Sequence, residues 1–254
     1  MYYKLFNNDK KYYFNNINHL DTLNNKHNVI QIIISCSNLK VLPNLKKFIN
    51  LEFLNCDDNL IIELSNLPNN LIDLYCSNNK LSEISKLPNN LKYLYCYNNQ
   101  LTKITQLPNN LNEIICYNNK LTIFPKLSIN LTDLYCNNNK LTQLLELNIN
   151  LTYIDCSYNQ LTELPELPNN LIHLYCEYNN LTQLCNLPIN LKYIDCSNNN
   201  KNLHKYIIQC KNLLNYKKYN KYRHINTLND FLNYSIENYY YFVIIEYYNK
   251  TKNY

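Results

Sequence analysis

The stretch Leu71–Asn90 reads LIDLYCSNNKLSEISKLPNN, and it decides the fold because its pattern recurs through most of the chain. Within this unit, apolar residues occupy positions 1, 4, 6, 11, 14 and 17, position 9 is asparagine and position 18 is proline. Nine of the 11 cysteines recur at intervals of 20 residues, from Cys36 to Cys196. A fixed period of this size is the signature of a solenoid, in which each unit stacks on the next.

The start of each unit predicts a short β-strand. Apolar and polar side chains alternate in Leu71–Cys76, which places Leu74 and Cys76 on the inner side of the strand. Successive strands, about 4.8 Å apart, then stack into a curved parallel sheet on the concave side of the solenoid. The return path of about ten residues is too short for a full helix, so we expect an extended or 3₁₀ convex side.

Two residue types form columns along the stack. We expect the cysteines to pack as small hydrophobic side chains, and the asparagines at position 9 to bond backbone groups of neighbouring turns. The cysteine ladder begins at Cys36 and continues through Cys56, Cys76, Cys96, Cys116, Cys136, Cys156, Cys176 and Cys196. The asparagine ladder comprises Asn59, Asn79, Asn99, Asn119, Asn139, Asn159, Asn179 and Asn199, whereas the first unit has Leu39 in that place.

The chain has no glycine, although every unit must turn sharply. Asparagine tolerates the left-handed αL region better than other non-glycine residues do. We therefore expect αL geometry at some asparagines of the turn before each strand, or at their neighbours. These asparagines are Asn50, Asn70, Asn90, Asn110, Asn130, Asn150, Asn170 and Asn190.

The pattern resembles the leucine-rich repeat, L-x-x-L-x-L-x-x-N/C-x-L, with cysteine in place of the third leucine. The 20-residue length and the spacer, as in LPELPNNLIHLYCEYNNL at Leu164–Leu181, are similar to the short repeats of bacterial secreted effectors. Similar Asn-rich repeats occur in proteins of large amoeba-infecting DNA viruses. The resemblance covers residues 31–200, about nine units, and implies a leucine-rich-repeat solenoid that serves recognition.

The two ends lie outside the repeats, and we expect both to be caps because a solenoid end exposes core and unpaired strand. Residues 1–30 would form the N-terminal cap and residues 201–254 the C-terminal one. The segment from about Leu228 to Tyr247 suits a second helix, although YYYFVII within it also suits a strand. The first C-terminal helix is predicted from apolar residues at helical spacing, which are Leu203, Ile207, Cys210 and Leu214.

Composition excludes several classes of protein. Without glycine there are no phosphate-binding loops, dinucleotide fingerprints or nucleophile elbows. The N-terminus lacks the pattern of a secretory signal, and the longest apolar stretch, Tyr239–Ile245, is far shorter than the roughly 20 residues of a membrane helix. We expect a protein without membrane contact in the reducing cytoplasm, which would be the host cytoplasm if the protein is viral.

No group of residues predicts catalysis, a metal site or a cofactor. Zinc needs four converging ligands, commonly in C-x₂₋₄-C pairs, and a linear column of thiols cannot provide them. Cys185 falls on a convex turn and Cys210 on the apolar stripe of its helix, so neither is expected to be a nucleophile. His173 projects from the concave sheet without a second histidine. A ubiquitin-ligase activity, as in bacterial effectors whose repeats precede a ligase domain, is the least favoured reading.

The outward positions of the strands, the third, fifth and seventh of each unit, define what we call the concave face. They contain no Lys or Arg. Tyrosine is enriched at binding hot spots, so we interpret this face as a protein-binding surface; the alternative is that tyrosine merely suits exposed strands. Its tyrosines are Tyr75, Tyr93, Tyr95, Tyr97, Tyr117, Tyr135, Tyr153, Tyr175 and Tyr193, and its acidic residues are Asp57, Asp73, Glu113, Asp133, Asp155, Glu177 and Asp195.

Charge is unevenly distributed along the chain. Residues 31–200 carry a net charge of −3 and residues 201–254 a net charge of +6, within a total of +5. The main hypothesis is a non-catalytic module that binds a basic or polar segment of a protein partner through the concave face. The alternative is association with nucleic acid through the tail 201–254, whose run Lys211–His224 interleaves bases and tyrosines. That run also suits a solvated helix face packed on the last repeat.

Overall fold

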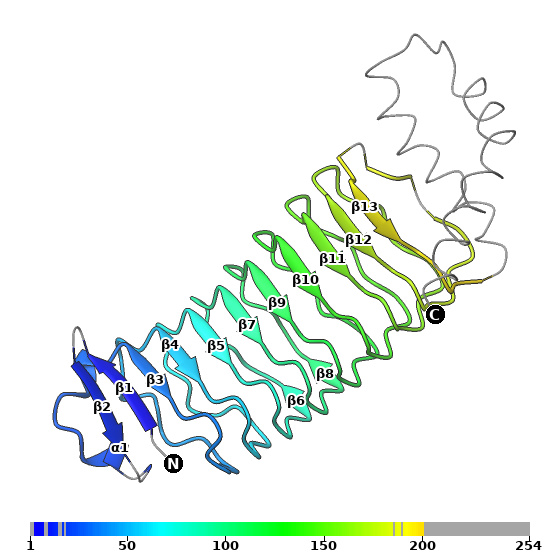
Figure 1. Ribbon diagram of the computed structural model, residues 1–254. Helices are drawn as coiled ribbons and strands as arrows, with labels where there is room; N and C mark the ends of the chain where they lie inside the picture. The colour runs from blue at the N-terminus through cyan, green and yellow to red at the C-terminus, as the bar shows by residue number, and fades with distance from the viewer. Residues whose placement is uncertain are drawn as a thin grey trace, which may run out of the picture. The chain divides into compact units, whose positions relative to one another are not determined.

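The described part of the protein is a solenoid with a long sheet along one side (Figure 1). The computed structural model describes residues 3–7, 10–14, 17, 19–184, 186–188 and 190–200. All of them belong to one compact unit, which ends at Asn200. The helices predicted beyond residue 200 lie outside the described residues. No helix within the described residues is long and apolar enough to cross a membrane.

The regular elements of the described residues are short, and most are strands of three residues. Before the repeats lie the strands β1 (Tyr3–Asn7) and β2 (Lys10–Phe14), the helix α1 (His19–Thr22) and a 3₁₀ turn (Lys26–Asn28). The strands of the repeat sheet are β3 (Gln31–Ile33), β4 (Phe53–Asn55), β5 (Asp73–Tyr75), β7 (Tyr93–Tyr95), β9 (Glu113–Ile115), β10 (Asp133–Tyr135), β11 (Tyr153–Asp155), β12 (His173–Tyr175) and β13 (Tyr193–Asp195). On the return side, β6 (Glu83–Ile84) pairs in parallel with β8 (Lys103–Ile104).

The repeat strands pair in parallel and in one register. From β4 to β13, each residue faces the residue 20 positions further along, as Leu74 faces Leu94 and Leu134 faces Ile154. Because the register equals the repeat length, each side-chain column is made of equivalent residues of successive units. The extended convex pair β6–β8 agrees with the expectation of a return path without a helix.

The N-terminal hairpin extends this sheet. β1 runs antiparallel to β3, with Leu5 opposite Ile32, and β2 pairs with the other side of β1. The backbone groups at the edge of β3 therefore bond a strand of the same chain, which is one of the ways in which proteins protect a sheet edge.

The first repeat corrects the predicted alignment, because it is two residues longer than the others. Ile32 faces Leu54, whereas a unit of 20 residues would have placed Ile34 opposite that leucine. The unit therefore runs from Val29 to Asn50 and has 22 residues. Ile34 takes the inner place that cysteine has in later units: it is fully buried, and its N–H donates to Asn55 O at 2.8 Å.

The sequence predicted that Cys36 belongs to the core column. In the structure, Cys36 is instead an exposed residue in the turn that follows the strand. Its distance of 20 residues from Cys56 is a coincidence of the longer first unit. Leu39 likewise does not occupy the ladder position: its N–H donates to Asn59 Oδ1 at 3.0 Å, as core leucines do in later units, and Ser37 stands in the ladder position. No earlier repeat is present there for an asparagine amide to bond.

The core is one continuous apolar column between the sheet and the return path. In the unit of Leu71, the side chains of Leu71, Leu74, Cys76 and Leu81 are fully buried, and Ile84 is 1% exposed. Most equivalent residues are buried in the other units, and Phe124 fills the place of Ile84 in its own unit. Each unit thus buries its apolar face only by stacking on its neighbours.

The asparagines at position 9 bond each unit to the unit before it. The Nδ2 of Asn119 donates to Cys96 O and Cys116 O, both at 3.0 Å, and its Oδ1 accepts the Leu101 N–H at 2.9 Å. The same set of bonds recurs from Asn79 to Asn199. These amides satisfy buried backbone groups that a short strand and a sharp turn leave unpaired.

The left-handed residues do not lie where the sequence predicted them. None of the asparagines before the strands has positive φ; the left-handed residue of each unit comes after the strand, at position 8, as Asn78 (φ 54°) and Asn98 (φ 53°) show. The turn before the strand closes with a bond such as Leu91 N to Pro88 O at 3.2 Å, and no residue in it has positive φ. Its asparagines instead bond sideways, as Asn110 Nδ2 does to Asn89 O at 3.2 Å.

Candidate functional site

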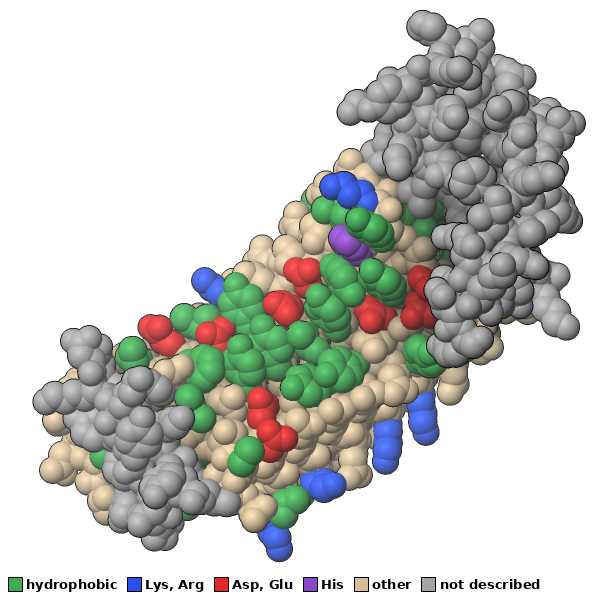
Figure 2. All heavy atoms as spheres, in the orientation of Figure 1, with side chains coloured by type: hydrophobic (Ala, Val, Ile, Leu, Met, Phe, Trp, Pro, Cys, Tyr) green, Lys and Arg blue, Asp and Glu red, His purple; other side chains and the backbone are tan. Residues whose placement is uncertain are grey.

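The concave face gathers aromatic rings and carboxylates on one side of the sheet. Figure 2 shows apolar side chains clustered over the middle strands, with acidic side chains beside them and basic ones at the margins. The central residue of most repeat strands is buried and its two neighbours are half-buried, so that alternate side chains face out, as predicted for this sheet.

The tyrosines of this face stack on one another instead of standing singly. Tyr75 stacks on Tyr95 with ring centroids 4.3 Å apart, and Tyr97 stacks on Tyr117 at 4.6 Å. Parallel strands place equivalent side chains one strand spacing apart, which is the separation at which offset rings attract. The rings are therefore held in fixed positions before any partner arrives.

A second group of rings lies over β10–β13. Tyr135 stacks on Tyr153 at 4.5 Å, and Tyr153 is 5.7 Å from Tyr175. His173, the histidine that was expected to project from the sheet, stacks on Tyr193 at 4.7 Å. Its Nδ1 is buried without a hydrogen-bond partner, and the ring packs as part of the aromatic stack. Tyr93 is half-buried at the outward position of β7.

Several carboxyl groups of the concave face have raised pKa values because they are partly buried. Burial raises the pKa of Asp57 to about 6, although the Ser77 N–H donates to its Oδ1 at 2.6 Å. Burial also raises the pKa values of Asp73, Glu113 and Asp155. Partial removal from water disfavours the charged form, and these sites would regain charge if a cation approached them.

The predicted core cysteines are buried in a single column from Cys56 to Cys196. The Sγ of Cys56 donates to Tyr75 O at 3.2 Å, and Cys116 makes the same bond to Tyr135 O at 3.3 Å. Burial raises the pKa of each of these two thiols. Such thiols are poor nucleophiles. The two remaining thiols, Cys185 and Cys210, lie outside the described residues, as does the basic tail.

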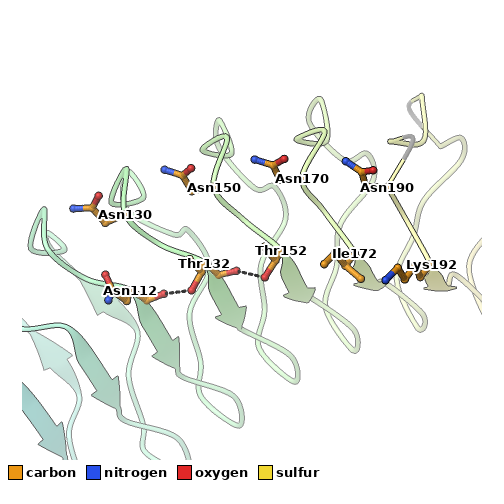
Figure 3. A pocket seen from close by; sticks show the side chains of 9 residues that line it. All are labelled: Asn112, Asn130, Thr132, Asn150, Thr152, Asn170, Ile172, Asn190 and Lys192. Carbon is orange, nitrogen blue, oxygen red and sulfur yellow. Dashed lines mark hydrogen bonds between the residues drawn. The ribbon is translucent and has the colours of Figure 1, made fainter.

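A polar groove runs along the edge of the sheet, at the starts of strands β9–β13 (Figure 3). It has a volume of about 710 Å³, and Lys192 is its only charged lining residue. Its asparagine amides already bond the solenoid, as Asn150 Nδ2 does to Ile129 O and Asn170 Nδ2 to Ile149 O. Because these donors are used internally, the concave face is the stronger candidate site.

Among the residues that the structure describes, no group of three or more His, Cys, Asp or Glu side chains is arranged to hold a metal ion.

The sequence did not reveal the role of position 8. Tyr158 and Tyr178 occupy that position with positive φ, and their rings stack at 4.3 Å. Their place beside the concave tyrosines was visible in the sequence, but their backbone geometry was not.

Comparison with known proteins agrees with this architecture. The family model described as "Leucine Rich repeats (2 copies)" matches residues 69–109. Among solved structures, YopM from Yersinia enterocolitica is 28% identical with a TM-score of 0.50, over 67% of this chain and 44% of that chain. A Shigella effector leucine-rich-repeat domain is 23% identical with a TM-score of 0.50, over 72% of this chain and 76% of that one. No curated protein sequence matches the chain.

The chain spans less than half of the length of the Yersinia enterocolitica protein that it resembles. The comparison is therefore with the repeat region of that protein. Leucine-rich repeats generally serve as protein-interaction modules. The described repeats of this chain form a leucine-rich-repeat solenoid, similar to the repeats of bacterial effectors.

Proposed function

We propose that the protein binds a protein partner through the concave face, and that the partner contributes a basic segment. The observation that carries this proposal is the coincidence of stacked tyrosines and carboxylates on a face without Lys or Arg. Rigid rings supply contact area at little entropic cost, because their positions are already set by stacking.

The charges of the face favour a basic partner. Among the described residues, the only ion pair joins Lys47 and Asp21, which are not outward residues of the strands. The carboxylates of the concave face thus have no cationic partner in this part of the chain. A partner's lysine or arginine would satisfy them and would offset their loss of contact with water.

The test compares two sets of substitutions in the full chain. Tyr75, Tyr95 and Tyr97 are replaced together by serine, and the partner is captured from cell extract, identified by mass spectrometry, purified and titrated by calorimetry. We expect binding to weaken by at least about tenfold, since tyrosine hot spots each contribute about 1 kcal/mol or more.

The matched control replaces exposed apolar residues on the return path, Ile123 and Leu145, by serine. This control should leave the affinity unchanged, and both variants should keep the wild-type circular dichroism spectrum. If the tyrosine variant bound the purified partner as tightly as the wild type did, the concave face would not be the binding surface.

A further inference from the structure

Position 8 carries a conformational demand that is the same in every complete unit of the described sheet. Its residue has φ of about +50°, and its N–H donates to the next unit, as Tyr158 N does to Glu177 O and Tyr178 N does to Ser197 O, both at 3.0 Å. Six units meet the demand with a short polar residue that tolerates this region, namely Asp58, Asn78, Asn98, Asn118, Asn138 and Asn198, and the first unit has Cys36 there. Tyr158 and Tyr178 are bulky residues, for which this backbone geometry is less favourable.

Burial of the two side chains in the core does not compensate for this less favourable backbone geometry. Tyr158 is 50% exposed and Tyr178 is 46% exposed, and their rings stack on each other with an interplanar angle of 12°. The asparagines at this position in earlier units instead join through their amides, as Asn98 Nδ2 does to Asn78 Oδ1 at 2.8 Å. Asparagine would thus serve the fold here as it does in the other units, and what tyrosine adds is a pair of exposed rings.

Two acidic residues lie near this pair. Glu177 directly precedes Tyr178 in the chain, and its backbone oxygen accepts the Tyr158 N–H at 3.0 Å. Partial burial and the neighbouring Tyr178 chiefly raise the pKa of the Tyr158 phenol, and Glu177 and Asp195 add to this rise. One carboxyl oxygen of Glu177, Oε2, is buried without a hydrogen-bond partner. A carboxylate that has little contact with water at one oxygen is stabilised by a charged hydrogen-bond donor at its other oxygen.

We infer that Tyr158, Tyr178 and Glu177 form a binding site for an arginine side chain of the partner. Arginine fits better than lysine because its planar guanidinium stacks on a tyrosine ring while its N–H groups donate to a carboxylate. The lysine ammonium ion can pair with the carboxylate, but it is not planar and cannot stack on the tyrosine rings. This inference rests on the proposed function and names the side chain that this end of the surface selects.

The experiment measures fluorescence anisotropy of labelled hexa-arginine and hexalysine peptides with the full chain at low salt. We expect the wild type to bind hexa-arginine about tenfold more tightly, which corresponds to one stacked, charge-assisted contact. Tyr158→Asn together with Tyr178→Asn should abolish that preference and keep the affinity for hexalysine within about twofold, because the carboxylates remain. Its melting temperature should not fall, since asparagine occupies the same position in other units.

The matched control replaces Ile123 and Leu145 on the return path by serine, and should keep the arginine preference. Glu177→Gln should weaken binding of both peptides. The site is overturned if the asparagine variant keeps the preference, or if its melting temperature falls by several degrees, which would make the ring pair structural. A preference lost equally in the serine control also overturns the site, because that loss would not be specific to the ring pair. If the wild type binds neither peptide, this site fails, and the capture experiment with Tyr75, Tyr95 and Tyr97 decides the proposed function separately.

Discussion

At the scale of single residues, the stability of the solenoid depends on asparagine side chains that replace missing backbone bonds. Asn119 is 9% exposed, donates to the carbonyls of two successive units and accepts an N–H from the earlier one. An amide is the side chain that offers both donors and an acceptor in one plane. No apolar residue of similar size could take its place without leaving buried backbone groups unpaired.

Replacing Asn119 by alanine should therefore lower the free energy of unfolding by about 3 kcal/mol, because several buried polar groups lose their partners together. Guanidinium-induced unfolding followed by circular dichroism would measure this change. Asn137→Ser, on the half-buried outward position of the next unit, should cost less than about 0.5 kcal/mol. Equal losses from the two substitutions would contradict the role of the ladder.

The buried carboxyl group of Asp57 predicts an unusual dependence of stability on pH. Its pKa in the folded state is about 6, above the value of 3.8 for an exposed aspartate, so the folded state binds the proton more tightly. Its contribution is fully present below about pH 4 and is lost as the pH rises through 6. Asp57→Asn should therefore stabilise the protein at pH 7.5 by about 1 kcal/mol, a value reduced for partial exposure, and should have little effect at pH 4.

Melting temperatures of the wild type and the Asp57→Asn variant across this pH range would test the prediction. Asparagine keeps an oxygen for the Ser77 N–H, so the hydrogen bond at 2.6 Å is retained and only the charge changes. A difference between the two proteins that does not vary with pH would show that titration of Asp57 does not affect folding.

At this scale the sequence predicted the residues of the asparagine ladder by their period, but it misplaced the left-handed turn. Both turns of each unit contain asparagine, and a residue that tolerates αL does not reveal which turn requires it. The stacking of the tyrosines could not be predicted from the sequence either. Outward positions follow from alternation alone, whereas the ring contact of Tyr135 with Tyr153 joins a fifth position to a third one and depends on side-chain torsions.

At the scale of elements, the three-residue strands are too short to be stable singly, and each is held by the strand before and the strand after it. The cysteine that follows each repeat strand from β4 onward closes the inner side, and its small side chain fits between the apolar residues of the strand and of the return path. The sequence predicted this arrangement for nine cysteines, and eight of them, from Cys56 to Cys196, are buried in the column. The prediction was wrong for Cys36, because a residue 20 positions before Cys56 is not its equivalent in a first unit of 22 residues. The pattern of apolar residues in the sequence does not reveal the two extra residues.

The cysteine column predicts a sharp difference in reactivity between Cys36 and the others. Brief treatment of the native protein with iodoacetamide should label Cys36, which is exposed, and leave Cys56 to Cys196 unlabelled until the protein unfolds, because burial lowers access and raises the thiol pKa. Mass spectrometry of the peptides would locate the label, and Cys36→Ser is the control. Labelling of Cys96 as rapid as that of Cys36 would contradict the buried column.

At the scale of the whole solenoid, cohesion comes from contacts between neighbouring units and not from a central core. Strands β7, β9 and β10 have several described repeat strands on both sides, and each unit contacts chiefly the unit before and the unit after it. The period of the sequence was sufficient to predict this architecture, because a repeat of 20 residues with one inner face has few other ways to bury it. The N-terminal hairpin was not predictable, since residues 1–30 carry no repeat pattern.

We expect amide hydrogen exchange to be slowest at β7, β9 and β10 and to become faster towards β3. Units near an end can open while breaking fewer neighbour contacts than units in the middle, so their local opening requires less free energy. Exchange followed by mass spectrometry of overlapping peptides would measure this gradient. Uniform exchange along the repeats would instead show that the solenoid opens as one cooperative unit.

The 22-residue first unit has a consequence for how such a chain can change its length over generations. Duplication or deletion of one whole 20-residue segment within the array would leave every column intact, because each rung meets an equivalent rung. An insertion of two residues in the middle would misalign the amide and thiol columns on both sides, whereas at Val29–Asn50 only one side has a repeat to match. Evolution of this protein is therefore free to add or remove whole rungs along its length, and irregular lengths are tolerated at its first rung.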